Sequence, residues 1–185
     1  LVDRLNTSIP GITPAEVAKL DKLAQTAVFT SQGVPFIYAG EEVMRDKKGV
    51  HNSFQSPDSI NAIDWSRKAL HADVFAYYKG LMQLRRNHPA FRLGDADAVR
   101  KHLEFLSVEG SNVIAFRLKD HAGGDAWKEI VVVLNARTEM AKVEVPEGKY
   151  IVVCRDGIIN EQGLGTLYGP ELQVPARSAL ILYQK

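Results

Sequence analysis

The pattern of apolar residues changes near residue 92, and this change constrains the fold more than any other feature of the sequence. Before this point, apolar residues recur at the three- and four-residue spacing of helices. Beyond it, short β-type runs are separated by Gly, Asn and Pro, as in all-β domains. We therefore predict two units, residues 1–92 and residues 93–185, and an α+β fold class.

Two helices are predicted in the first unit. Residues 13–33 begin with Thr13 as N-cap, and Glu16 completes a capping box three positions later. Residues 73–87 form the second helix, which ends at a His-Pro pair. Its helically spaced apolar residues are expected in the core: Val74, Tyr77, Tyr78, Leu81 and Leu84.

Between these helices, residues 34–39 form a short apolar run without polar alternation. Such a run is typical of a strand buried on both faces in a parallel sheet. Glu41 and Glu42 follow at its carboxyl end, where α/β folds place their ligands. A single strand with two helices leaves its backbone edges unpaired. Because the chain also begins at Leu1 rather than Met, we expect it to be a segment of a longer protein.

The second unit contains seven runs that predict strands. They are Leu103 to Val108, Val113 to Leu118, Ile130 to Leu134, Val143 to Val145, Tyr150 to Val153, Leu172 to Val174, and Ala179 to Tyr183. Residues 109–112 are predicted to form a hairpin turn. A spacing of one strand in every ~10 residues favours an antiparallel sandwich.

The composition excludes several classes of protein. With 45% hydrophobic and 24% charged residues and a net charge of +1, the sequence is typical of an ordinary globular protein. Lys and Arg form no basic stripe, so no nucleic-acid partner is expected. No apolar stretch approaches the ~18 residues of a membrane span. Cys154 is predicted to be buried, and the dispersed His residues show no metal-site spacing.

Residues 33–42, which read GVPFIYAGEE, resemble the eighth-strand signature of the α-amylase superfamily, Gly-x-Pro-x-x-Tyr-x-Gly-x-Glu. Residues 51–65 look like the following loop in type I pullulanases. Residues 77–92 are similar to the last barrel helix of that family. Three blocks in the correct order are far more specific than one short motif.

This resemblance implies the last strand and flanking helices of a (β/α)8 barrel, followed by an antiparallel β-sandwich. It implies a parent enzyme that hydrolyses α-1,6-glucosidic bonds of pullulan, amylopectin or limit dextrins with retention. The family's nucleophile, acid/base and third carboxylate lie on other barrel strands. The isolated chain, without catalytic residues, is therefore expected to be inactive. No cofactor is expected here, although a calcium ion in the rest of the barrel stays open, as does the cellular compartment.

Three acidic residues are expected to support the active site. Retaining hydrolysis needs two carboxyl groups ~5 Å apart, whereas neighbouring residues on a strand point to opposite faces. We therefore expect Glu42 to stabilise the active-site floor by hydrogen bonds, and Glu41 to contact a basic or backbone partner such as Arg45. Asp3 lies in a stretch that resembles the continuation of the family's His-Asp-Asn segment, although Val2 replaces a Trp found in many pullulanases.

The loop after the predicted strand supplies the candidate substrate-binding residues. Asn52 and Phe54 are the main candidates and Ser53 and His51 the lesser ones, because polar groups match sugar hydroxyls and an aromatic ring stacks on a sugar face. Two alternatives stay open. Asn and Ser also shape long loops, and Phe54 could anchor the loop against the barrel. Trp65 is expected to pack.

The second unit has two non-catalytic interpretations, a carbohydrate-binding module or a purely structural domain. A binding module displays a row of exposed aromatic rings. Here the aromatic residues mostly fall in apolar runs, and Trp127, flanked by Asp125 and Lys128, is the one candidate for an exception. The incomplete barrel is also expected to favour self-association through its open strand edge.

Overall fold

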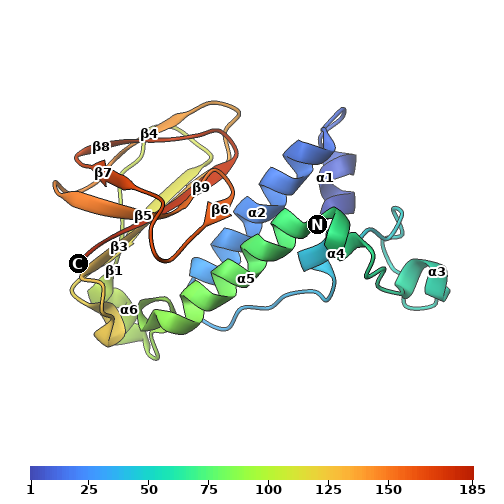
Figure 1. Ribbon diagram of the computed structural model, residues 1–185, viewed down its shortest axis with the longest axis horizontal. Helices are drawn as coiled ribbons and strands as arrows, with labels where there is room; N and C mark the ends of the chain where they lie inside the picture. Colours follow the sequence, from blue (N-terminus) through green and yellow to red (C-terminus); the bar gives the residue numbers. More distant parts are fainter.

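The computed structural model describes residues 1–185 as a set of helices packed against antiparallel strands (Figure 1). The helices are α1 (Val2–Ser8), α2 (Pro14–Thr30), α3 (Asp58–Asn61), α4 (Arg67–Leu70), α5 (Ala72–Asn87) and α6 (Ala96–His102), with short 3-10 turns η1 (Glu41–Val43), η2 (Pro89–Arg92) and η3 (Ala122–Gly124). The strands are β1 (Leu103–Phe105), β2 (Val113–Leu118), β3 (Glu129–Asn135), β4 (Ala141–Glu144), β5 (Lys149–Arg155), β6 (Ile158–Ile159), β7 (Thr166–Tyr168), β8 (Glu171–Val174) and β9 (Ser178–Gln184). No helix combines the length and apolar character needed to cross a bilayer.

Both predicted helices are confirmed. The capping box at the start of α2 is present, since Thr13 Oγ1 accepts from the Glu16 amide at 3.2 Å and the Thr13 amide donates to Glu16 Oε2 at 3.1 Å. The predicted apolar stripe of α5 is buried in full. Helix α6 was not predicted. Asp95 caps it by accepting from the Ala98 amide at 2.8 Å.

The strands form one large and one small antiparallel sheet. The large sheet has the order β1-β2-β3-β9-β5-β6, with β7 also paired to β5, while β4 and β8 pair separately. Each predicted run contains or overlaps one of these strands, and only the short β6 and β7 were not predicted. The predicted turn at residues 109–112 lies in the β1–β2 connection, where Gly110 and Asn112 adopt positive φ.

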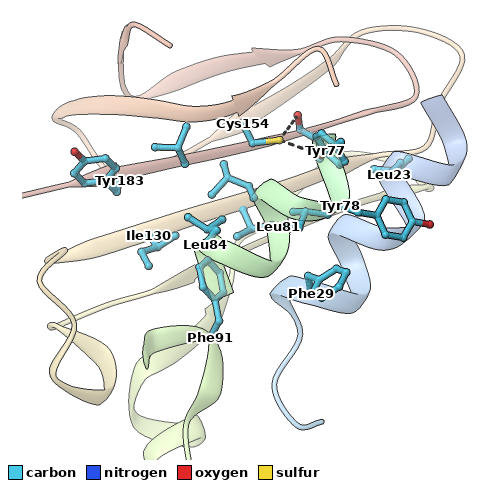
Figure 2. Close-up of a cluster of buried hydrophobic side chains, with 14 of the residues drawn as sticks. Leu23, Phe29, Tyr77, Tyr78, Leu81, Leu84, Phe91, Ile130, Cys154 and Tyr183 are labelled. Carbon is cyan, nitrogen blue, oxygen red and sulfur yellow. Dashed lines mark hydrogen bonds between the residues drawn. The ribbon is translucent and has the colours of Figure 1, made fainter. Parts of the chain in front are cut away.

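The large sheet buries both of its faces. On β3, Ile130 and Val132 face a core shared with α2 and α5, whereas Val131 and Val133 face a second core under β4 and β8. Figure 2 shows Leu81 and Leu84 of α5 in the first of these cores. The result is a layer of helices, a large sheet and a small sheet. A continuous apolar core therefore joins residues on either side of position 92.

Residues 34–39, which were predicted to be a strand buried on both faces, form no strand within this chain. The segment is not paired with any strand, and its side chains alternate between partly buried Pro35 and Ile37 and outward Val34 and Phe36. Val34 is 95% exposed and Phe36 is 88% exposed. A parallel strand requires neighbouring strands, and none of the strands of this chain lies beside this segment.

Buried polar groups connect α5 to the strands. The Tyr77 hydroxyl lies 2.6 Å from Thr26 Oγ1 and 3.1 Å from Cys154 Sγ (Figure 2). Cys154 is fully buried, as predicted, and this burial raises the pKa of its thiol to about 12.

A second polar junction lies at the end of α5. His88 Nδ1 is 2.9 Å from Asp125 Oδ1, and the His88 ring stacks on Trp127 with ring centroids 3.5 Å apart. Trp127 also stacks on Tyr183 at 3.8 Å. Trp127 is only 8% exposed, so this candidate for an exposed aromatic residue is buried as well. Its ring fills the space between α5 and β9 instead.

Candidate functional site

The long polar loop and α1 enclose an open hollow of about 870 Å³. In Figure 1 the loop that carries α3 lies beyond the helices, away from the strands. The hollow is lined by Leu1, Asp3, Arg4, Thr7, Tyr38, Glu41, Arg45, Lys47, Gly49, Val50, His51, Asn52, Ser53, Phe54 and Asn61. The structure thus brings together all four predicted loop residues with two of the three predicted supporting acids. We call this hollow the groove.

Asn61 organises the loop, although it is not among the predicted site residues. Its Nδ2 donates to the carbonyls of Ser53 at 2.7 Å and Ser56 at 2.8 Å, and its Oδ1 accepts from Lys47 Nζ at 3.1 Å. Lys47 Nζ also donates to Ser53 Oγ. Ser53 is therefore held inside the loop, which favours the loop-shaping role among the two that the sequence left open. The signal was available in principle, because Asn commonly bonds to nearby backbone groups.

The other predicted sugar contacts are presented freely to solvent. The side chains of His51 and Asn52 make no hydrogen bond within the protein, and both residues are exposed. Phe54 is 77% exposed in this chain. Trp65 is 60% exposed, so the expectation that it packs is wrong. These features leave a free amide and a free aromatic face at the groove.

Glu41 and Glu42 lie in the 3-10 turn η1 rather than at the end of a strand, so the strand argument for their directions is wrong. Successive side chains of a 3-10 turn point about 120° apart, and only Glu41 lines the groove. Glu41 Oε2 accepts from Gln25 Nε2 at 3.1 Å, so the partner is Gln25 and not Arg45. Glu42 Oε2 accepts from the Gly40 amide at 3.0 Å.

Asp3 joins α1 to the loop. Its carboxylate accepts from the amides of Lys47 at 3.2 Å and Gly49 at 3.1 Å. Burial acts to raise the pKa of Asp3, but a hydrogen bond from Asp46 and the two amides lower it on balance. The same hydrogen bond, followed by burial, raises the pKa of Asp46. Asp3 is therefore occupied in holding the loop.

Two cations flank the tyrosine of the groove. The Arg45 guanidinium lies 5.2 Å from the centroid of the Tyr38 ring, and Lys47 Nζ lies 5.3 Å from it. A hydrogen bond with Lys47 is the main cause that lowers the pKa of Tyr38. The groove thus combines aromatic faces, amides and cations. Its two lining carboxylates, Asp3 and Glu41, already accept hydrogen bonds from the protein.

The sequence and the structure of this chain are similar to those of known proteins. Residues 99–158 match the family described as "Pullulanase, all-beta domain". The pullulanase of Bacillus subtilis is 37% identical over 153 residues, which are 82% of this chain and 21% of that protein. The crystal structure of a Bacillus acidopullulyticus pullulanase matches 99% of this chain with a TM-score of 0.95 and 43% identity, and 22% of that chain is covered.

A Paenibacillus barengoltzii pullulanase, crystallised with maltohexaose and α-cyclodextrin, matches 99% of this chain and 28% of its own at 40% identity and a TM-score of 0.88. These similarities place the chain in a class of related proteins that includes pullulanases, an isoamylase and a glycogen debranching enzyme. Within that class it belongs to the pullulanase family, which confirms the resemblance of residues 33–42. It spans about a fifth of the length of its Bacillus relatives.

Proposed function

We propose that this chain is the carboxyl-terminal portion of a pullulanase-like enzyme that hydrolyses α-1,6-glucosidic bonds of branched α-glucans with retention. Residues 1–92 would complete a (β/α)8 barrel, and residues 93–185 would form the β-sandwich that supports it. The observation that carries the proposal is the groove, where the predicted loop residues meet Asp3 and Glu41 on one open face. Similarity to pullulanases over nearly the whole chain supports the same assignment.

In this proposal residues 34–39 are the eighth barrel strand. Their outward side chains, Val34, Phe36 and Tyr38, form an apolar row next to the groove. In the isolated chain this row lacks a neighbour, so we expect concentration-dependent self-association. Light scattering over a dilution series checks this, and a monomer at all concentrations would contradict it.

The groove is proposed to bind the glucan chain through His51, Asn52 and Phe54, with Ser53 acting mainly through the loop. A ring stacks on the apolar face of a glucose unit, while amide groups bond to its hydroxyls. Related pullulanases have been crystallised with maltose, maltotetraose and maltohexaose. These ligands are linear α-glucans, and the maltohexaose complex also contains the cyclic α-cyclodextrin.

Asp3, Glu41 and Glu42 are proposed to support the site rather than to react. Each carboxylate accepts hydrogen bonds within the protein, so none is a free nucleophile paired with a free acid. The reacting carboxylates would lie in the remainder of the enzyme. The groove residues suggest no cofactor of their own, and a calcium ion would belong to the remainder of the barrel.

Hydrolysis of pullulan tests this division of labour. The purified chain should release no reducing ends, whereas the same chain extended upstream by a complete barrel should release them steadily. Anomeric analysis of the first product reports retention or inversion. Turnover by the isolated chain would overturn the proposal and would direct attention to Glu41, Glu42 and Asp58 as catalytic groups.

Phe54→Ala is expected to weaken maltotetraose binding by the extended protein by roughly fivefold, or about 1 kcal/mol, because it removes a stacking face. Isothermal titration calorimetry measures the change in Kd. Phe105→Ala is the matched control, since Phe105 is similarly exposed, at 70%, but lies on β1 away from the groove. Equal effects of the two substitutions would remove Phe54 from the binding site.

A carbohydrate-binding role for the strands alone is less well supported. Two aromatic rings of the sheet are exposed, Phe105 at 70% and Tyr168 at 65%. Phe105 lies on β1 at one edge of the sheet, and Tyr168 lies on β7, so β2, β3, β9 and β5 separate them. Two rings at opposite sides of a sheet form no row for a sugar chain. The strands fit a supporting role better.

A further inference from the structure

Two buried side chains of α2 each carry an oxygen without a hydrogen-bond partner. Asp21 is 1% exposed and Gln25 is 4% exposed, and the unpaired atoms are Asp21 Oδ1 and Gln25 Oε1. An unpaired buried polar atom is costly, so native structures rarely retain one. Because both atoms lie on one face of α2, one hydrogen placed between them would give both a partner.

The remaining polar atoms of this pair are bonded in a defined order. The Tyr78 hydroxyl of α5 donates to Asp21 Oδ2 at 3.0 Å. Gln25 Nε2 donates to Glu41 Oε2 at 3.1 Å, and Glu41 lines the groove. One hydrogen bond thus joins α5 to Asp21 and another joins Gln25 to the groove, while no hydrogen bond joins Asp21 to Gln25.

One proton would join Asp21 to Gln25. Residues four apart on a helix have Cβ atoms ~5–6 Å apart and lie on one face, so their side chains can meet. Two acceptors cannot bond to each other, but a protonated Asp21 carboxyl can donate from Oδ1 to Gln25 Oε1. This single change pairs both orphan atoms and leaves the two existing hydrogen bonds in place.

We propose that Asp21 is held as a neutral carboxylic acid and, through Gln25, positions Glu41 at the groove. The role of the groove in this statement rests on the proposed function, whereas the protonation of Asp21 does not. Asp21 is therefore a positioning residue and touches no substrate.

The charged surroundings agree with a neutral acid. The pKa of Asp21 is raised to about 7, mainly by burial and also by the charge of Glu41, against the hydrogen bond from Tyr78, which lowers it. The amino group of Leu1 and Lys22 on the same helix oppose the shift only in smaller measure. Lys22 Nζ is already bonded to Asp73 at 2.8 Å.

Asp21→Asn provides the sharpest test, because an amide at this position can donate to Gln25 and accept from Tyr78 at any pH. A raised pKa in the folded state means that the native protein holds a proton that the unfolded chain has released. The wild-type protein should therefore lose stability as pH rises from about 4 to about 7, while the variant should not show this loss. Above pH 7 the variant should melt several degrees higher than the wild type, and near pH 4 the two should agree.

Asp97→Asn on α6 is the matched control, since the Asp97 side chain is 92% exposed, and its pH profile should follow the wild type. A bridging water with an ionised Asp21 is the competing arrangement. This arrangement predicts that Asp21→Asn does not raise the melting temperature at pH 8. It also predicts that the Asp21 carboxyl group titrates near 4. Either result would overturn the proposal.

If the variant does not fold, carbon-detected NMR of the wild-type protein measures the pH at which the Asp21 carboxyl group titrates. Titration near 7 supports the proposal, and titration near 4 overturns it. These readouts use no glucan. If the extended protein fails to bind maltotetraose while Asp21 titrates near 7, the proposed function is refuted and the protonation of Asp21 still stands.

Discussion

Leu84→Ala is expected to lower the free energy of unfolding by about 2–5 kcal/mol, the range for deleting a buried leucine side chain. Leu84 is 2% exposed on α5 and packs in the core between the helices and the large sheet. The substitution leaves a cavity at the layer that joins the two parts of the chain. Urea unfolding followed by far-ultraviolet circular dichroism measures the loss.

The same helix supplies the control for this experiment. Met82 lies two residues away and is 45% exposed, so Met82→Ala removes a side chain of similar size from the solvent side. It should cost well under 1 kcal/mol, as surface substitutions generally do. Similar losses for the two variants would contradict the packing of α5 against the sheet.

Asp125→Ala is expected to lower the free energy of unfolding by about 3–5 kcal/mol, because it leaves several buried donors without an acceptor. Asp125 Oδ1 accepts from the Trp127 amide at 2.9 Å and lies 2.9 Å from His88 Nδ1. Its Oδ2 accepts from the Ala90 amide at 3.2 Å. The carboxylate thus fastens η2, at the end of α5, to the segment before β3. Thermal or urea unfolding at neutral pH gives the value.

The pH dependence of this interaction has a definite sign. Burial acts to raise the pKa of Asp125, but hydrogen bonds from His88 and from the Trp127 and Ala90 amides lower it on balance. The stabilisation is present above the ordinary pKa of an aspartate, about 3.9, and is lost as pH falls through the lowered value. Asp97→Ala removes an exposed acid whose partner is Arg100, and should change stability by less than 1 kcal/mol. An equal loss in both variants would disprove the junction.

Much of the fold could be predicted because the signals are local. The capping box at Thr13 and Glu16 needs only four residues to form, and the structure contains it. The apolar runs that became β2, β3 and β9 follow from residues whose faces are both buried. Mixed helices and antiparallel strands, and membership of the pullulanase family, are therefore confirmed.

The errors arose where an element depends on neighbours that the local sequence does not reveal. Residues 34–39 have the composition of a buried strand, but a strand exists only when it is paired. Polar neighbours made Trp127 a candidate for exposure, whereas His88 and Tyr183 cover both of its faces. Trp65 was expected to be packed but is exposed, because nothing in this chain packs over the end of the polar loop.

The candidate site was predicted as a set of residues but not as a network. His51, Asn52, Ser53 and Phe54 were expected together because they are contiguous, and they do line one groove. The partners of Glu41 and of Asp3 lie far from them in sequence, at Gln25 and in the turn after Asp46. Contacts of that kind depend on how α1, α2 and the loop are placed, which no local pattern encodes.

The position of β9 has a consequence for the order in which the molecule assembles. This strand follows all the others in the chain, yet it lies at the centre of the large sheet between β3 and β5. During synthesis the earlier strands emerge first, and their central partner is absent until residues 178–184 leave the ribosome. The helices and the β1–β2–β3 meander can form early, but both apolar cores stay open until this last strand inserts. Folding of the whole layer is therefore expected to be a late, slow and cooperative event.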